Sequence, residues 1–285
     1  MREGAASKYS TRFIMYAFLI VVSFISVFPL YWAFISAFNN TQQILGGRMI
    51  PSTHLMENLK NLFAQQNVLL AMKNSFATSL LQVALSLIIS SIAGYGFEIY
   101  HDKYKDGLMS VLMLAMMVPF VAVLVPLFQM MSKAKLLNTW VGFFIPSMAT
   151  PFLIMYFRNS ARTFPRDTIE AARIDGANEF FIFHRIVIPM SKNGVFAIAI
   201  FQFLWAWEDY LWPYLVITSP EKQLIAVGLK LFNGQYQTDY GSMGAALVIA
   251  TLPTLVLYMP KPPVPAVPNV WIRLSNRGIP APAKR

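Results

Sequence analysis

The chain lacks cysteine entirely across its 285 residues, which excludes disulfide bonds and thiolate metal sites. Its three histidines, His54, His101 and His184, are far apart and none has a ligand partner at helical spacing, so we expect no metal site. No phosphate-binding loop of the form G-x4-G-K-[S/T] occurs, so the chain is not expected to hydrolyse ATP. No serine or carboxylate constellation indicates covalent catalysis. We therefore predict no catalytic residue, no metal and no cofactor within this chain.

Charge is also scarce. Only 13% of the residues are charged and 56% are hydrophobic, giving a positive mean hydropathy. A soluble domain usually has about 25% charged residues. The chain therefore has too little polar surface for a water-soluble body of its size, and the composition indicates a membrane protein.

Uncharged runs place the membrane segments. A helix needs about 20 residues to cross a hydrocarbon core of about 30 Å. Five uncharged runs reach that length, at residues 13–47, 74–97, 107–132, 136–157 and 240–260. A sixth run, 193–220, is interrupted only by Glu208 and Asp209. The runs are continuous rather than alternating, which favours helices over a transmembrane barrel, so we predict an all-α membrane protein with six transmembrane helices.

The predicted helices cover residues 13–38, 74–97, 108–131, 140–157, 195–217 and 242–259. They form one six-helix transmembrane domain, 13–259, between an N-terminal segment, 1–12, and a Pro-rich, irregular tail, 260–285. The outer loop, 39–73, is long enough to hold a short helix. Prolines at depth either kink a helix or break it to line a pathway, and we expect kinks at Pro29, Pro119, Pro126, Pro146 and Pro151.

Basic residues predict the orientation. With the N-terminus inside, 16 of the 23 Lys and Arg residues fall in inner segments. The bias favours both termini on the cytoplasmic side, and the largest basic group lies in the inner segment 158–194. The net charge of +10 is then explained by topology and by attraction to anionic membrane lipid, with no nucleic-acid partner.

A motif in that inner segment carries a specific resemblance. The sequence Glu-Ala-Ala is followed after two residues by Asp-Gly-Ala, and after eight more by Ile-Val-Ile-Pro. This pattern resembles the coupling motif of ABC-importer permeases, EAA-x2-DGA-x8-I-x-L-P, and departs only at Ile188. The residues that the resemblance marks for ATPase coupling are Glu170, Ala171, Ala172, Asp175, Gly176, Ala177, Phe180, Ile186 and Pro189.

The motif also makes physical sense as a docking element. Asp167 is expected to cap a short helix, with Glu170 in its first turn, where a carboxylate is favoured. Gly176 permits a sharp backbone bend before a second short helix. Phe180, Phe181 and Phe183 supply an apolar face, and Pro189 is expected to end the segment. The alternative from the residues alone is an ordinary surface helix with a solvated Glu170.

Residues 203–213 and 243–253 resemble helices five and six of carbohydrate-uptake permeases of the maltose type. Within the first stretch the substrate-pathway candidates are Trp205, Trp207, Glu208, Asp209 and Tyr210. The family usually has Asn in place of Glu208. Either Glu208 and Asp209 are hydrated near the outer interface, or one of them faces the pathway and contacts sugar hydroxyls. The Pro-rich tail also departs from the family, so no tail contact is carried over.

The resemblance implies a type I ABC-importer permease fold in a bacterial inner membrane. It also implies a second permease subunit, usually a different chain, two ATP-binding subunits that hold ATP and Mg, and an extracytoplasmic sugar-binding protein. An ion-coupled secondary transporter and a non-transporting membrane scaffold stay open as alternatives. The sequence does not identify the sugar: glucans, acidic uronate oligosaccharides and glycerol phosphates are all compatible.

Overall fold

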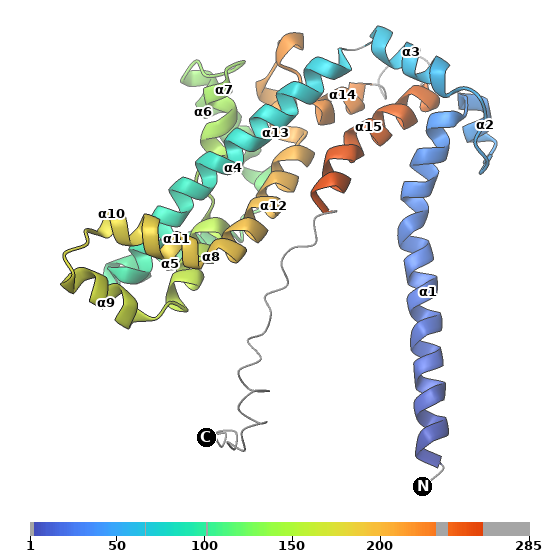
Figure 1. Ribbon diagram of the computed structural model, residues 1–285. Coiled ribbons are helices and arrows are strands. Elements are labelled where there is room, and N and C mark those ends of the chain that lie inside the picture. Colours follow the sequence, from blue (N-terminus) through green and yellow to red (C-terminus); the bar gives the residue numbers. More distant parts are fainter. Residues whose placement is uncertain (1–2, 66, 101, 232–238, 259–285) are drawn as a thin grey trace. The chain divides into compact units, whose positions relative to one another are not determined.

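The computed structural model describes residues 3–65, 67–100, 102–231 and 239–258, and every regular element in these ranges is helical (Figure 1). The chain divides into two compact units, residues 1–74 with 221–253, and residues 75–220 with 254–285. The predicted all-α class is confirmed. The Pro-rich tail of the sequence prediction, 260–285, lies outside the described residues.

The first unit is built around the end of the first long helix. Its elements are α1 (Glu3–Phe38), α2 (Thr41–Leu45), α3 (Leu55–Gln65), the start of α4 (Val68–Ile99), α14 (Ile225–Leu231) and most of α15 (Tyr240–Tyr258). The buried Asn58 side chain donates from Nδ2 to the carbonyl oxygens of Ala37 and Asn39, at 2.9 and 3.0 Å. Ser242 Oγ donates to the Asn58 carbonyl at 3.2 Å. These bonds join α1, α3 and α15 through buried side chains and backbone carbonyls.

The second unit contains the rest of α4 and the elements that follow it. These are α5 (Lys103–Ala115), α6 (Phe120–Lys133), α7 (Trp140–Phe144), η1 (Ile145–Ser147), α8 (Pro151–Arg162), α9 (Arg166–Ile174), α10 (Glu179–Phe181), the π-helical η2 (Ile182–Val187), α11 (Ile188–Met190), α12 (Lys192–Glu208) and α13 (Leu211–Val216). The short 3-10 element η3 (Pro220–Lys222) follows where the chain returns to the first unit.

Three helices of the described residues can each cross a membrane unbroken: residues 12–38 of α1, all of α4, and 240–257 of α15. Three further spans are available if bent helix pairs count as one span each. The pairs are α5 with α6, bent by 103°, α7–η1 with α8, by 47°, and α10–α11 with α12, by 81°. By length and composition, the described residues therefore offer between three and six candidate spans, and the predicted six is the upper value. The predicted outer loop, 39–73, holds α2, α3 and the start of α4.

The prolines separate into two groups. Pro29, Pro126 and Pro253 lie inside continuous helices. Pro119 is instead the N-cap of α6, and Pro151 is at the start of α8, where Thr150 caps the helix by accepting from the Leu153 amide. The expectation of simple kinks is wrong at these two positions, where the helices break. The first residues of a helix need no intrahelical donor, so proline is tolerated there.

The predicted fifth helix, 195–217, is also wrong in its extent. α12 ends at Glu208, Asp209 takes an extended conformation, and α13 begins at Leu211. The Asp209 carboxylate accepts from the Trp212 amide at 3.4 Å, across the start of α13. This local hydrogen bond gives the backbone an alternative to helix at Asp209.

Close packing of α4 on α8 forms the core of the second unit. A Cβ atom placed on Gly94 would fall 2.6 Å from Phe157 Cβ and 2.7 Å from the Arg158 nitrogen. Leu153 and Phe157 of α8 pack with Ile198 of α12 in a buried cluster. Glycine at position 94 thus lets two helix backbones approach more closely than any side chain would permit.

Candidate functional site

The coupling motif forms short helical pieces separated by one sharp bend. α9 ends at Ile174, and Gly176 has a φ of +85°, in the left-handed region that favours glycine. Asn178 then caps α10 by accepting from the Phe181 amide at 2.8 Å. The predicted bend at Gly176, with a second helix leaving at an angle, is confirmed. Together α9, α10, η2 and α11 are called the motif segment (residues 166–190) below.

Three details of that prediction are wrong. Pro165, not Asp167, is at the N-cap of α9, and Asp167 lies in the first turn. Because the helix begins at Arg166, Glu170 lies beyond the first turn and is not placed at the positive end of the helix dipole. The third error concerns Pro189, which lies inside α11; the chain turns two residues later, at Ser191, before α12.

The inner side of the motif segment packs against the end of α4. Tyr95, Ile169, Ile182 and Val187 form a buried cluster. Half-buried side chains pack around it, from Ile99, Phe164, Ala172, Ala177, Phe183 and Ile186. The Phe183 ring lies 5.4 Å from the Tyr95 ring, centroid to centroid. Three motif residues, Ala172, Ala177 and Ile186, therefore hold the segment to its own subunit.

Polar contacts reinforce this attachment. Glu179 Oε1 accepts from Arg173 Nε at 2.6 Å, closing the bend around Gly176 from one side to the other. Glu179 Oε2 accepts from the Tyr95 hydroxyl at 3.0 Å. The hydrogen bond to Glu179 raises the pKa of Arg173 above its ordinary value, so its guanidinium stays charged at any physiological pH.

The remaining motif residues point away from this cluster. Glu170, Ala171, Asp175 and Pro189 are exposed, and Phe180 is 73% exposed. The non-motif side chain of Ile174 is 86% exposed at the end of α9. A carboxylate and small residues on α9, beside two large exposed apolar side chains, make a surface suited to a protein partner.

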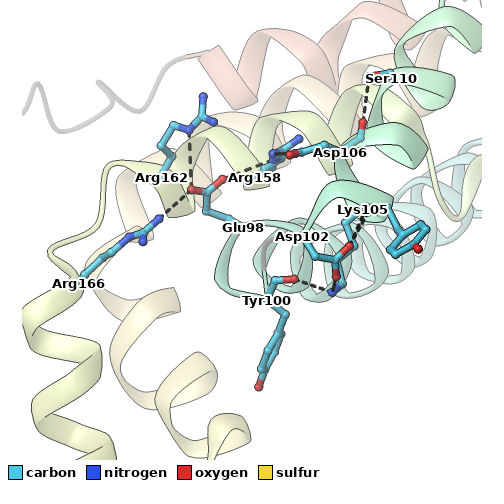
Figure 2. Close-up of polar contacts among 10 residues, drawn as sticks. Glu98, Tyr100, Asp102, Lys105, Asp106, Ser110, Arg158, Arg162 and Arg166 are labelled. Atoms are coloured by element: carbon cyan, nitrogen blue, oxygen red, sulfur yellow. Dashed lines mark hydrogen bonds and ion pairs between the residues drawn. The ribbon is translucent and has the colours of Figure 1, made fainter.

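A buried carboxylate lies beside the motif segment (Figure 2). Glu98, at the end of α4, is only 4% exposed and receives three guanidinium groups. Arg158 Nε lies 3.4 Å from Oε2, and Arg162 Nε and Arg166 Nη2 lie 3.7 and 3.5 Å from Oε1. Arg158 Nη2 also donates to Asp106 Oδ1 at 2.7 Å. These five residues are called the Glu98 cluster; they come from α4, α5, α8 and the first residue of α9.

The turn into α5 adds a further ion pair. Asp102 caps α5 by accepting from the Tyr104 and Lys105 amides, and its carboxylate also pairs with the Lys105 ammonium. The side-chain hydrogen bond from Lys105 lowers the pKa of Asp102 below its ordinary value. Asp102 therefore stays ionised and keeps the start of α5 fixed beside the Glu98 cluster.

The substrate-pathway candidates lie around the end of α12 without forming one site. Trp205 is 67% exposed, whereas Trp207 is buried and stacks on Phe203 with ring centroids 5.8 Å apart. Glu208 and Tyr210 are exposed and Asp209 is half-buried. Trp207 therefore belongs to the core of its own subunit, which leaves Trp205, Glu208 and Tyr210 as the accessible members of the set.

Sequence reasoning missed the Glu98 cluster. In the sequence, Glu98 is only the end of an uncharged run, and Arg158, Arg162 and Arg166 serve only as topology signals. The available signal was a lone carboxylate directly after a membrane helix, in a chain whose inner basic group holds four arginines between residues 158 and 173. Among the described residues, no three His, Asp or Glu side chains gather to hold a metal ion.

These features define a helical, multi-pass membrane protein with a bent, partly exposed motif segment between α8 and α12. Residues 86–260 match the family described as binding-protein-dependent transport system inner membrane component. The chain is 36% identical over 245 residues to the lactose transport system permease protein LacG of Rhizobium radiobacter, covering 86% of this chain and 90% of the relative. It is 31% identical to the arabinooligosaccharides transport system permease protein AraQ of Halalkalibacterium halodurans, covering 84% and 87%.

A solved structure shares the fold. A chain of a bacterial ABC transporter involved in the import of the acidic polysaccharide alginate superposes with a TM-score of 0.79, at 20% identity, over 88% of this chain and 95% of that one. The chain belongs to the family of binding-protein-dependent transport system inner membrane components. It is a permease component of an ABC importer in the inner membrane.

Proposed function

We propose that this permease carries a sugar or oligosaccharide across the inner membrane. The proposal rests on the lactose and arabinooligosaccharides named for two relatives that match most of this chain. It also rests on exposed aromatic and carboxylate side chains, Trp205, Tyr210 and Glu208, near the end of α12. Sugars are bound by such groups, because aromatic rings cover their apolar faces and carboxylates accept from their hydroxyls.

The importer assembly contains four further parts in this proposal. A second permease, a different chain, completes the pore, and an extracytoplasmic solute-binding protein delivers the sugar. Two ATP-binding subunits hold ATP and Mg and dock on the exposed side of the motif segment. Both termini of this chain lie on the cytoplasmic side with that segment, in keeping with the bias of its basic residues.

The exposed face around Glu170 is the observation that carries the coupling role. Glu170 lies on α9 beside Ala171, and the described contacts tie another side of this helix to Tyr95 through Ile169. A partner groove that presents a basic side chain would bury Glu170 in an ion pair. Loss of one member of such a pair costs about 2–5 kcal/mol of binding free energy. Movement of the ATPase subunits would then pass through the motif segment into the membrane helices as a rigid-body motion.

ATP hydrolysis by the reconstituted complex tests this proposal. We expect lactose or an arabino-oligosaccharide, delivered by the binding protein, to stimulate hydrolysis in the wild type and not in Glu170→Ala. Glu57→Ala on α3, another exposed carboxylate outside the motif segment, is the matched control and should behave as wild type. An ATP hydrolysis rate that depends on neither the sugar nor Glu170 would contradict the proposal.

A further inference from the structure

The Glu98 cluster connects the membrane helices α4 and α8 to the first residue of the motif segment. Figure 2 shows Arg158, Arg162 and Arg166 converging on Glu98. Arg162 is the last residue of α8 and Arg166 the first of α9, and both guanidiniums lie near the same atom, Glu98 Oε1. One carboxylate oxygen therefore holds both sides of the turn that leads into the motif segment.

The helix that bears Glu98 is itself fixed to α8. Gly94 lies one turn before Glu98, and it allows the α4 backbone to contact Phe157 and Arg158 closely. On the next turn Arg158, 12% exposed, donates to Glu98. Steric contact at Gly94 and ion pairing at Glu98 thus act on the same helix face, since residues four apart share a face.

A nearly buried carboxylate is stable as an ion only when it is compensated, because burial without partners carries a large desolvation cost. Glu98 has that compensation from Arg158. Arg162 and Arg166 are not needed to compensate the buried charge of Glu98, because their own side chains are 65% and 73% exposed. Because both guanidiniums lie near Glu98 Oε1, they instead connect the α8–α9 turn to α4.

We propose that Glu98 is a positioning residue for coupling: it clamps the start of the motif segment to α4, so that α4, α8 and α9 move together. The proposal rests on the proposed function, because the movement it transmits is that of the ATPase subunits. Glu98 touches neither ATP nor sugar in this mechanism. It acts through Arg162 and Arg166 on the helix that carries Glu170.

Glu98→Gln is the variant that tests the clamp. It keeps the size of the side chain and removes the charge. Arg158 keeps its bond to Asp106 at 2.7 Å, and Arg162 and Arg166 are solvated, so no buried charge loses its last partner. We therefore expect the variant to fold and assemble. Arg166→Gln, a change at an exposed residue, removes the link to α9 alone and should reproduce the effect.

Because the natural chain has no cysteine, a single pair of introduced thiols reports on the clamp. Spin labels at Ile92→Cys on α4 and Asp167→Cys on α9, both exposed positions, give the distance between the two helices for the full chain in lipid nanodiscs. We expect a narrow distance distribution in the otherwise natural chain and in Glu57→Gln. The distribution should broaden in Glu98→Gln and in Arg166→Gln, and recover in part in Glu98→Asp.

The second measurement is sugar transported per ATP hydrolysed in the full complex, with lactose and arabino-oligosaccharides as probes. We expect the ratio to fall by about tenfold in Glu98→Gln, within the range of residues that modulate coupling between sites, while the ATP-binding subunits still co-purify. Glu98→Asp should restore most of the ratio, which a merely structural role would not require.

Unchanged distances and an unchanged ratio in Glu98→Gln would overturn the proposal. Broadened distances with an unchanged ratio would overturn it too, because the clamp would then be structural only. If the wild-type complex transports no sugar, the proposed function fails, and the distance measurement still decides on the clamp: unchanged distances then overturn it.

Discussion

Gly94 is the position where the addition of one carbon atom should most clearly lower the stability of the second unit. A Cβ atom there would lie 2.6 Å from Phe157 Cβ, 2.7 Å from the Arg158 nitrogen and 2.8 Å from the Ile154 carbonyl oxygen. Two of these three atoms belong to the α8 backbone, which cannot rotate out of the way. Gly94→Ala must therefore push α8 away from α4. Gly96, two residues further along the same helix, is a matched control, because a Cβ atom there would meet nothing within 4 Å.

The two variants should shift stability in opposite directions. Alanine is favoured over glycine in a helix interior by about 0.5–1 kcal/mol, and both variants gain that amount. Overpacking costs about 1–3 kcal/mol, and only Gly94→Ala has this cost. We expect Gly94→Ala to be less stable than wild type by about 1–2 kcal/mol and Gly96→Ala to be slightly more stable.

Thermal unfolding in detergent micelles measures the difference. A change of 1 kcal/mol shifts the melting temperature by about 2–4 °C for a chain of this size range, so Gly94→Ala should melt several degrees below Gly96→Ala. Equal melting temperatures would refute the reasoning, because they would mean that α4 and α8 do not pack as closely as the structure has them.

Three further changes test other parts of the account. Gly176→Ala should cost about 1–2 kcal/mol in the motif segment, because its φ of +85° is strained for a residue with Cβ; limited proteolysis of the segment should become faster. Asn58→Leu leaves the Ala37 and Asn39 carbonyls without their shared donor and should lower stability by about 1–3 kcal/mol for each, seen as a lower melting temperature. Glu208→Ala should reduce sugar uptake by about tenfold or more if its carboxylate binds a sugar hydroxyl, while ATPase-subunit binding is unchanged; unaltered uptake would exclude Glu208 from the pathway.

The sequence was a good guide where one local cause decides the structure. Uncharged runs long enough for a membrane predicted the helices, because backbone in lipid must satisfy its own hydrogen bonds. Gly176 predicted the bend between α9 and α10, because few other residues take a positive φ. The exposed Glu170 and the inward Ala172 and Ile186 agree with a docking segment held by its own subunit.

Helix breaks were harder to predict, because proline can either lie inside a continuous helix or stand at the start of a new one. Pro126 lies within a continuous helix and Pro119 begins one after a 103° bend, and the choice depends on packing against distant segments. The Glu98 cluster was missed for a similar reason. Its partner Arg158 is 60 residues away in the chain, so no local pattern brings the two charges together. The Asp209 carboxylate accepts from the Trp212 amide at the start of α13, directly after α12 ends, which apolar periodicity does not reveal.

ATP-dependent sugar uptake tests the central claim most directly. Proteoliposomes that contain this chain, its neighbouring permease and the ATP-binding subunits would receive a radiolabelled lactose or arabino-oligosaccharide bound to the solute-binding protein. ATP would be supplied on the side of the ATP-binding subunits, with ion gradients collapsed. We predict sugar accumulation that requires ATP and is lost in Glu170→Ala. Accumulation that follows an ion gradient and proceeds without ATP would contradict the account and indicate a secondary transporter.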